Sequence, residues 1–232
     1  MAAFFVTSTG TDIGKTYVTA GLLRCLRREG ASAIKPVASG FTAETAAASD
    51  PVVLLEAMGE AVSEDTLARI SPWRFAEPLS PDMAAAREGR VIDYDALIEF
   101  CRAGVMRANG PCFVEGVGGV MVPLDARHTV RDWMAALGLP VVLVVGSYLG
   151  TISHTLTALD VLARARLRVA AVVVNETKES GVPLDETIAV LRRFAGAVPV
   201  ASLGRDASEA QFLQLWRQFC GEAQSTVPPE SD

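Results

Sequence analysis

Residues 9–16, Thr-Gly-Thr-Asp-Ile-Gly-Lys-Thr, have the composition of a phosphate-binding loop. They follow an apolar run at 4–6 and precede a helical pattern at 16–28, and such loops occur between a strand and a helix. Backbone N–H groups of the loop and of the helix start would surround phosphate oxygens. Lys15 would reach the β- and γ-phosphates, and the Thr16 hydroxyl would hold Mg²⁺. The segment predicts a nucleotide site, although Thr9 stands where the strict pattern has glycine; the alternative is an ordinary glycine-rich turn.

Two further charged residues follow other apolar runs. Lys35 precedes Pro36, which disfavours a helix at Lys35 and keeps it extended, so its side chain is expected over the carboxyl edge of the sheet. A second lysine there could compensate charge that develops during phosphoryl transfer, whereas the alternative is a solvated surface lysine. Glu115 ends the apolar run at 112–114, where a carboxylate ligand for Mg²⁺ is expected opposite a phosphate loop.

Other polar residues allow two interpretations each. Asp50 precedes Pro51, a pair that suits a helix N-terminus as well as a metal site. Asn175 follows the run at 169–174, where its amide could bind a base edge or simply belong to a turn. His128 and His154 lack the spacing of metal ligands and are interpreted as packing or capping residues.

The apolar pattern predicts an α/β fold, in which a parallel sheet carries helices on both faces, in a single P-loop NTPase-like domain. β-Branched runs at 4–6, 112–114, 141–145 and 169–174 predict buried strands, with 33–34 as a weaker fifth. Helical patterns lie between them at 16–28, 51–58, 81–88, 94–107, 130–137, 151–164 and 184–194. The carboxyl ends of parallel strands share one edge, so the polar residues above should meet there. The domain is expected to span 1–221, with 43–49 a flexible loop and 222–232 a poorly ordered tail.

Composition narrows the classes of function. The 232 residues carry a net charge of −6 without a basic block, so neither nucleic acid nor an anionic membrane is expected as a partner. The four cysteines are scattered, no signal peptide is expected, and the apolar stretch at 139–146 is too short to cross a bilayer. These features predict a cytoplasmic protein.

The chain also resembles one enzyme family, the dethiobiotin synthetases. The resemblance rests on six stretches in colinear order between residue 4 and about residue 176: 6–16, 35–40, 49–50, 75–81, 114–119 and 149–154. It implies ATP- and Mg²⁺-dependent closure of a cyclic urea from 7,8-diaminononanoate and carbon dioxide. A carbamate forms on one amine and is phosphorylated by ATP, and the second amine then displaces phosphate.

The resemblance also implies roles for individual residues. Lys15 and Lys35 would stabilise carbamate and phosphoryl charge, while Thr11 and Ser39 would contact the diamine or carbamate. Mg²⁺ would bind Thr16, Asp50 and Glu115. Gly150 and Thr151, at a helix start, would bind the distant substrate carboxylate from the partner subunit of a homodimer with shared active sites. The residues expected to bind ATP are Asp12, Ile13, Gly14, Lys15, Thr16, Tyr17, Asp50, Glu115, Gly116, Val117, Gly118, Asn175, Glu176, Pro199, Val200 and Ala201.

The chain departs from the family pattern at Ser8, where glycine is usual, and at Asp82, where histidine is common; the match near Pro199 is poor. Two other functions stay open. A partitioning-type or metal-insertion ATPase would act on a protein partner, but the partitioning-type ATPases carry a second loop lysine where this chain has Gly10. A catalytically silent scaffold would not need Lys15, Thr16, Lys35 and Glu115 together.

Overall fold

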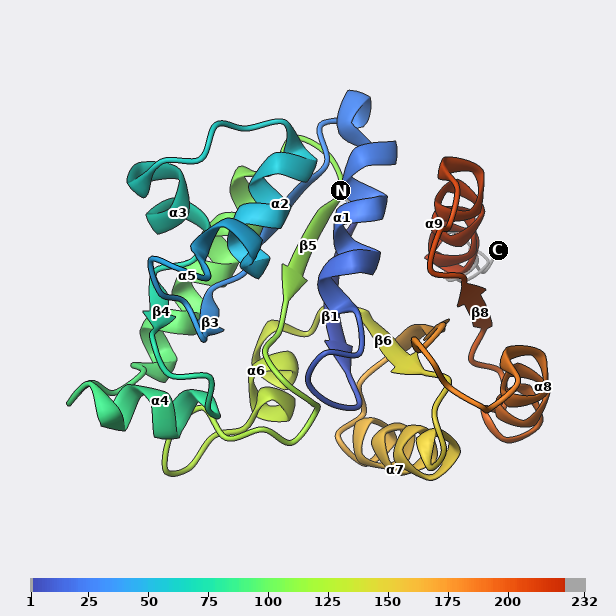
Figure 1. Cartoon of the computed structure of the whole chain (residues 1–232). Coiled ribbons are helices and arrows are strands. Elements are labelled where there is room, and N and C mark those ends of the chain that lie inside the picture. Colours follow the sequence, from blue (N-terminus) through green and yellow to red (C-terminus); the bar gives the residue numbers. More distant parts are fainter. Residues whose placement is uncertain (1, 224–232) are drawn as a thin grey trace, which may run out of the picture.

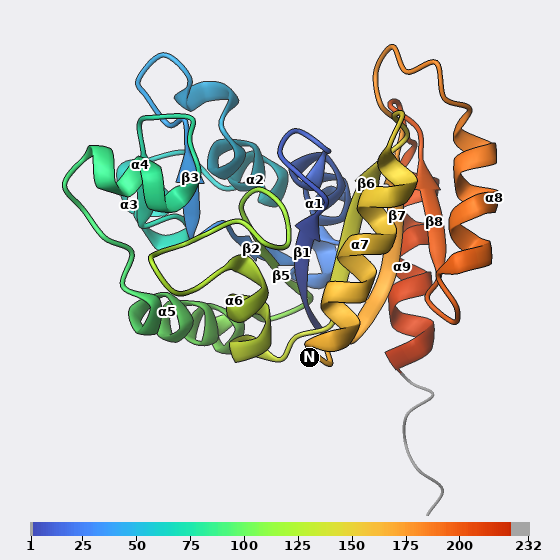
Figure 2. The same cartoon turned by 90° about the horizontal axis from the view of Figure 1, so that it is seen from below.

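A six-stranded parallel sheet forms the centre of the molecule, in a computed structural model that describes residues 2–223. Its strand order is β2-β5-β1-β6-β7-β8 (Figures 1 and 2). The strands are β1 (Ala3–Ser8), β2 (Ser32–Ile34), β5 (Cys112–Glu115), β6 (Val141–Gly146), β7 (Val169–Asn175) and β8 (Val200–Leu203). The predicted parallel α/β fold is confirmed.

The central strands are buried almost continuously, because helices cover both faces of the sheet. The strand β8 was not predicted; it pairs with β7 from Val200 opposite Val172 to Leu203 opposite Asn175. A second sheet contains only β3 (Val37–Ser39) and β4 (Trp73–Phe75), which are also parallel. Pro36 separates β3 from β2, so the chain leaves one sheet for the other immediately after Lys35.

Seven of the observed helices lie where the sequence predicts them. These are α1 (Lys15–Cys25), α2 (Asp50–Met58), α4 (Pro81–Arg87), α5 (Tyr94–Arg107), α6 (Val130–Leu137), α7 (Thr151–Arg164) and α8 (Leu184–Phe194). The first is shorter than predicted and is followed by a 3₁₀ turn, η1 (Arg27–Glu29). Another 3₁₀ turn, η2 (Ala46–Ala48), lies within the expected loop at 43–49. Among the described residues, no helix is long and apolar enough to cross a membrane.

Two helices, α3 (Glu64–Ile70) and α9 (Glu209–Ala223), were not predicted. Helices α1, α2 and α9 cover one face of the sheet, and α5 to α8 lie on the other (Figures 1 and 2). The ring of Phe4 lies 5.8 Å from that of Trp216 and 5.6 Å from that of Phe219, so α9 completes the core over the start of β1. Most of the predicted tail, from residue 224 on, lies outside the described residues.

Candidate active site

The loop between β1 and α1 wraps around the ammonium group of Lys15. Its Nζ donates to Ser8 Oγ at 3.0 Å, to the carbonyl of Gly118 at 3.0 Å and to that of Gly10 at 3.3 Å. Ser8 is fully buried, and its Oγ also lies 2.5 Å from the Gly10 carbonyl. The serine that replaces the usual glycine therefore ties the loop to Lys15, a role that the sequence alone did not reveal.

The last glycine of the loop, Gly14, lies against the end of β7, which is two strands away from β1 in the sheet. Gly14 has a φ of 103°, a left-handed conformation that L side chains rarely adopt. A Cβ at this position would also lie 2.2 Å from Asn175 Nδ2. That amide nitrogen donates to the carbonyl of Ile13 at 2.9 Å, whereas Asn175 Oδ1 is buried and has no hydrogen-bond partner in the described chain. A hydrogen bond thus joins the end of β7 to the phosphate loop, and Asn175 Oδ1 remains an acceptor without a donor in the described chain.

Lys35 lies at the centre of a buried charge cluster. Its Nζ contacts Glu115 Oε1 and Asp50 Oδ2, each at 2.8 Å, and donates to the Gly116 carbonyl at 2.8 Å. Lys35 is 1% exposed and Glu115 0%, so the solvated-lysine alternative is wrong. Asp50 is the first residue of α2, but its carboxylate contacts Lys35. This contact supports the interpretation of Asp50 as a site residue over that of a helix cap.

The same cluster contains oxygen ligands suited to Mg²⁺. Thr16 Oγ1 donates to Glu115 Oε1 at 2.7 Å, and Asp50, the third residue expected to bind the metal, is linked to Glu115 through Lys35. Glu115 Oε2 is buried and has no hydrogen-bond partner in the described chain, so a cation would supply the partner it lacks. No group of three or more His, Cys, Asp or Glu side chains suited to a metal occurs between residues 2 and 223. A small set of carboxylates fits Mg²⁺, which keeps waters and shares phosphate oxygens.

Charges in the cluster shift the pKa values of its members. Burial and, to a smaller extent, the nearby Lys35 ammonium lower the pKa of Lys15 to about 8, against the opposing effect of the carboxylates. Burial alone would lower the pKa of Lys35, but Glu115 and Asp50 hold it above its usual value. Burial would likewise raise the pKa of Asp50, but Lys35 and Thr16 hold it below its usual value. Lys35 and Asp50 are therefore both charged at neutral pH.

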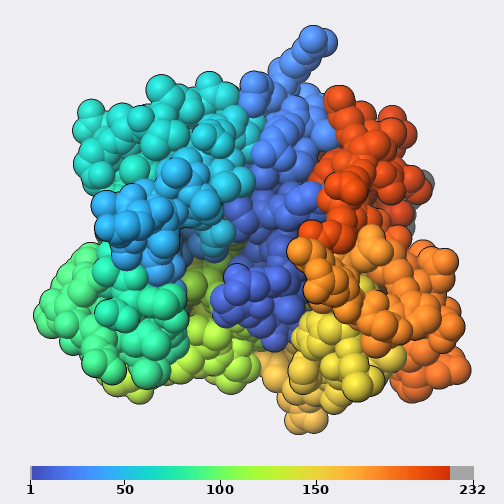
Figure 3. Space-filling model, in the orientation of Figure 1, coloured from blue at the N-terminus to red at the C-terminus, as the bar shows by residue number. Residues whose placement is uncertain are grey.

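A cavity of about 1060 Å³ opens over this cluster. Figure 3 shows the surface hollowed between the dark blue phosphate loop and the blue and teal segments that follow β3 and β4. Its walls include the expected site residues Thr11, Asp12, Gly14, Lys15, Thr16, Lys35, Ser39, Asp50, Val117 and Gly118. Ser80, Pro81 and Met83 also line it, whereas Asp82 does not; Asp82 accepts a hydrogen bond from Ser80 Oγ at 2.6 Å. This cavity could hold a polyphosphate and a second, smaller substrate.

On the other side of the loop, Tyr17 and Glu176 hold the segment that follows β8. Tyr17 Oη donates to the carbonyl of Gly204 at 2.9 Å and accepts the N–H of Ala207 at 3.0 Å. Glu176 Oε2 accepts the N–H of Arg205 at 3.3 Å, and the Glu176 N–H donates to the Leu203 carbonyl. Both residues were expected to bind the nucleotide; in the structure both contact the segment after β8.

The segment 199–201, which was expected to bind adenine, lies beside the middle of β7 and not at the carboxyl edge of the sheet. Val200 and Ala201 are buried within β8, and Val200 pairs with Val172 in the middle of β7. The residues that reach the carboxyl edge beside Asn175 are Leu203 and those after it. The geometry therefore favours a nucleotide contact after Leu203 over one at 199–201, the segment that the family resemblance implied where its match is poor.

The helix start at Gly150 and Thr151 does not line the large cavity. Thr151 is buried, its hydroxyl donates to the Gly146 carbonyl at 2.7 Å, and its N–H donates to the Tyr148 carbonyl at 3.0 Å. In the described chain, the N–H groups of Ile152 and Ser153 have no backbone carbonyl partner outside the helix. These two N–H groups could donate to an anion, whereas the hydroxyl and the N–H of Thr151 already have carbonyl partners.

Both histidines pack locally, in agreement with their interpretation. His128 stacks on Tyr94 at 3.8 Å between ring centroids, and its Nδ1 lies 2.8 Å from Asp125 Oδ2. His154 Nδ1 lies 2.9 Å from Tyr148 Oη.

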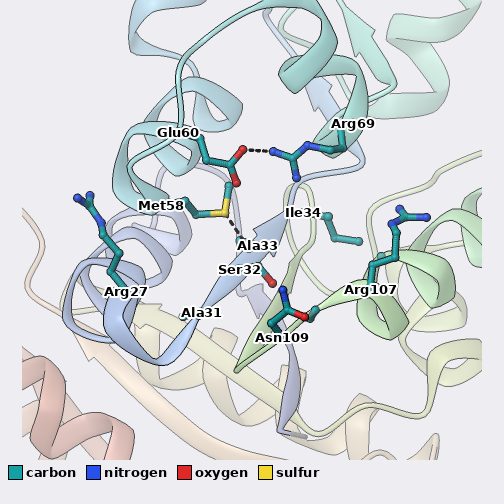
Figure 4. Close-up of a pocket in the computed structure, with 13 residues that line it drawn as sticks. Arg27, Ala31, Ser32, Ala33, Ile34, Met58, Glu60, Arg69, Arg107 and Asn109 are labelled. Carbon is teal, nitrogen blue, oxygen red and sulfur yellow. Dashed lines mark hydrogen bonds and ion pairs between the residues drawn. The ribbon is translucent and has the colours of Figure 1, made fainter.

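A second cavity of about 310 Å³ lies along the open edge of β2, away from the cluster (Figure 4). The N–H of Ala33 donates to the Met58 sulfur at 3.3 Å, and Arg69 pairs with Glu60. None of the expected site residues lines this cavity. The thioether and the flanking arginines cover an edge strand that would otherwise be free to pair with another chain.

Comparisons with known proteins match this arrangement over most of the chain. A family model described as an AAA domain matches residues 2–206. The "ATP-dependent dethiobiotin synthetase BioD" of Acidiphilium cryptum is 54% identical over 202 residues, covering 86% of this chain and 91% of that protein. Its namesake from Phenylobacterium zucineum is 46% identical over 214 residues, covering 90% and 92%.

Solved structures share the fold at much lower identity. The hydrogenase maturation factor HypB of Archaeoglobus fulgidus superposes with a TM-score of 0.57 at 11% identity, over 94% of this chain and 89% of that one. A chain of the MinC:MinD cell division complex of Aquifex aeolicus gives 0.56 at 11% identity, over 100% and 99%. At this identity the likeness extends to the fold alone.

Proposed function

Because the chain belongs to the family of ATP-dependent dethiobiotin synthetases, we propose that it closes a cyclic urea from 7,8-diaminononanoate and carbon dioxide at the expense of ATP. One amine adds to carbon dioxide to give a carbamate, and a carbamate oxygen takes the γ-phosphoryl group as ADP leaves. The second amine then attacks the carbamoyl carbon, and phosphate departs. The observation that carries this proposal is the pair of buried lysines, Lys15 and Lys35, facing one cavity large enough for both substrates.

The lysines suit a reaction in which negative charge moves between oxygens. Lys15 lies within the phosphate loop, where its ammonium would donate to β- and γ-phosphate oxygens in place of the Gly10 and Gly118 carbonyls. Lys35 enters the cavity from the β2 side, next to Ser39, and would face the carbamate oxygen that attacks phosphorus. Placing positive charge at both ends of the transfer lowers the barrier without moving solvent.

Mg²⁺ bound with ATP would neutralise the phosphate oxygens and hold them in line for the transfer. Thr16, Asp50 and Glu115 would hold it, as their mutual contacts and the unpartnered Glu115 Oε2 support. These residues also keep the cation on the side of the cavity where α1 begins, close to the phosphate loop.

The test is conversion of the diamine with ¹³C-labelled bicarbonate and ATP. We expect dethiobiotin labelled at the urea carbon, with one phosphate released per ring closed. ATP hydrolysis that does not need the diamine but needs a protein partner would support a partitioning-type ATPase instead. Absence of any turnover by folded protein would support a silent scaffold.

We also propose a homodimer with shared active sites. Its support is that the free N–H groups of Ile152 and Ser153 belong to a helix start that does not line the cavity of its own chain. A two-fold partner could bring that helix start to the far end of the substrate, where the carboxylate lies.

Subunit complementation tests the shared site. Lys35→Ala protein is mixed with protein carrying Ser153→Glu, which places a carboxylate at the proposed anion site on an exposed residue. Mixed dimers would contain one site free of both changes, so statistical exchange should restore about a quarter of wild-type activity. A monomer with full activity, or no recovery after verified exchange, would refute the shared site.

A cytoplasmic setting is part of the same proposal. Cys101 and Cys112 are free thiols buried in the core, as suits a reducing compartment.

A further inference from the structure

The ammonium group of Lys35 occupies the place between the two carboxylates that are proposed to bind Mg²⁺. Its Nζ lies 2.8 Å from Asp50 Oδ2 and 2.8 Å from Glu115 Oε1. Glu115 Oε1 is also the atom that accepts the Thr16 hydroxyl at 2.7 Å. One cation thus already contacts one oxygen of each carboxylate, while Glu115 Oε2 has no hydrogen-bond partner in the described chain.

A metal ion bound to either carboxylate would compete with this ammonium for the same negative charge. Mg²⁺ binds oxygen at about 2.0–2.1 Å and requires near-octahedral directions around it. Lys35 is 1% exposed, so its charge is screened little by water, and two like charges on shared oxygens repel strongly. Lys35 can leave only if another anion accepts it, because an unpaired buried ammonium is costly.

We propose that Lys35 is an internal placeholder for the metal, which keeps Asp50 and Glu115 paired in the empty protein and excludes free divalent cations. The inference rests on the proposed function for the identity of the metal residues. The metal then enters together with ATP, because the phosphate and carbamate oxygens give Lys35 new partners as it releases the carboxylates. Lys35 thereby acts twice, first as a positioning residue for the metal site and then as a charge-stabilising group.

Lys15 provides a matched control within the same cluster. It carries the same charge and is also buried, but its Nζ contacts Ser8 and two backbone carbonyls and neither carboxylate. Removal of Lys15 therefore tests the general loss of positive charge, whereas removal of Lys35 also vacates the metal position.

The experiment measures Mn²⁺ binding by electron paramagnetic resonance without nucleotide, in wild type, Lys35→Met and Lys15→Met. Removal of a like charge a few ångströms from the metal predicts at least about tenfold tighter Mn²⁺ binding by Lys35→Met than by wild type. Lys15→Met should gain about threefold or less, because its contribution acts only through space. Equal gains in the two variants, or no gain in Lys35→Met, would overturn the placeholder.

Two further measurements keep the inference testable if Lys35→Met folds poorly. Lys35→Gln removes the charge but keeps a hydrogen-bonding group, and it should show the same gain. In crystals of the wild type, Nζ of Lys35 should stay on Asp50 with Mg²⁺ alone and leave it with Mg²⁺ and a non-hydrolysable ATP analogue; the reverse result would refute the placeholder. If wild type with the analogue fails to bind Mn²⁺ at Glu115, the proposed metal site itself is wrong.

Discussion

The contact between Lys35 and Glu115 can be measured through the stability of the protein without ligands. At 2.8 Å and an effective dielectric constant of 20, the attraction of the two charges is about 6 kcal/mol, most of which offsets their removal from water. Lys35→Met deletes the ammonium but keeps the apolar stem, leaving Glu115 with no counter-charge. We expect a loss of about 3–4 kcal/mol in the free energy of unfolding, near the lower end for a broken buried pair. The Asp50 carboxylate adds little to this loss because it is 45% exposed, so water can solvate it once the ammonium is removed.

Glu115→Gln should be milder, at about 1–2 kcal/mol, because Asp50 still pairs with Lys35 and the amide oxygen still accepts hydrogen bonds. The double variant should lose only about 2 kcal/mol, which gives a coupling of about 3 kcal/mol. For a chain of this size, Lys35→Met should lower Tm by about 6–16 °C. Urea unfolding of the four proteins at pH 7.5 with chelator measures the cycle. Losses that simply add, with a coupling below about 0.5 kcal/mol, would show that the two residues do not stabilise one another.

Four further predictions concern activity. Lys35→Ala should lower kcat by about 10²-fold or more with a smaller change in ATP affinity, as steady-state and binding assays would show, because its charge acts mainly in the transition state. Glu115→Gln should sharply raise the Mg²⁺ concentration needed for activity; an unchanged requirement with a lower Tm would make Glu115 purely structural. The pKa of Lys15 is about 8 in the empty protein and ATP favours its charged form, so ATP affinity should be full below pH 8 and fall up to about tenfold per pH unit above it, by calorimetry. Tyr17→Phe should weaken ATP binding about fivefold, the equivalent of one hydrogen bond, without changing kcat. The control variant Tyr148→Phe, which removes an exposed hydroxyl, should bind ATP as the wild type does. A lower Tm of Tyr17→Phe with unchanged ATP affinity would contradict the role of Tyr17.

Much of the fold could be predicted because buried parallel strands consist of continuous runs of β-branched residues. The strand β8 (Val200–Leu203) has no such run, since its four residues include Ala and an exposed Ser202 at the sheet edge. Helix α9 (Glu209–Ala223) is amphipathic and follows Ser208, whose N–H donates to Gln211 Oε1 at 2.8 Å; this Ser-x-x-Gln start signal was overlooked in the prediction. Short or edge elements are fixed by their neighbours, so their own sequence carries little of the information.

The site shows the same division. Lys15, Thr16 and Glu115 could be placed because each adjoins a strand whose carboxyl end was predictable. The contact of Lys35 with Asp50 could not be, because it depends on the path of the chain through β3 and η2, and because Asp-Pro also suits a helix start. The role of Ser8 could not be predicted for another reason. A serine where the family usually has glycine shows that the loop differs, but the sequence does not show which atoms the hydroxyl contacts.

The amide of Asn175 and the left-handed Gly14 restrict how this protein can change by mutation. Any side chain at position 14 meets two separate obstacles, the φ of 103° and the amide nitrogen 2.2 Å from its Cβ. Shortening Asn175 removes only the second, so no single compensating substitution restores the loop, and the same change sacrifices the hydrogen bond to Ile13. The two positions therefore constrain each other, whereas the exposed side chains of Arg205 and Asp206, after β8, can be substituted without this conflict.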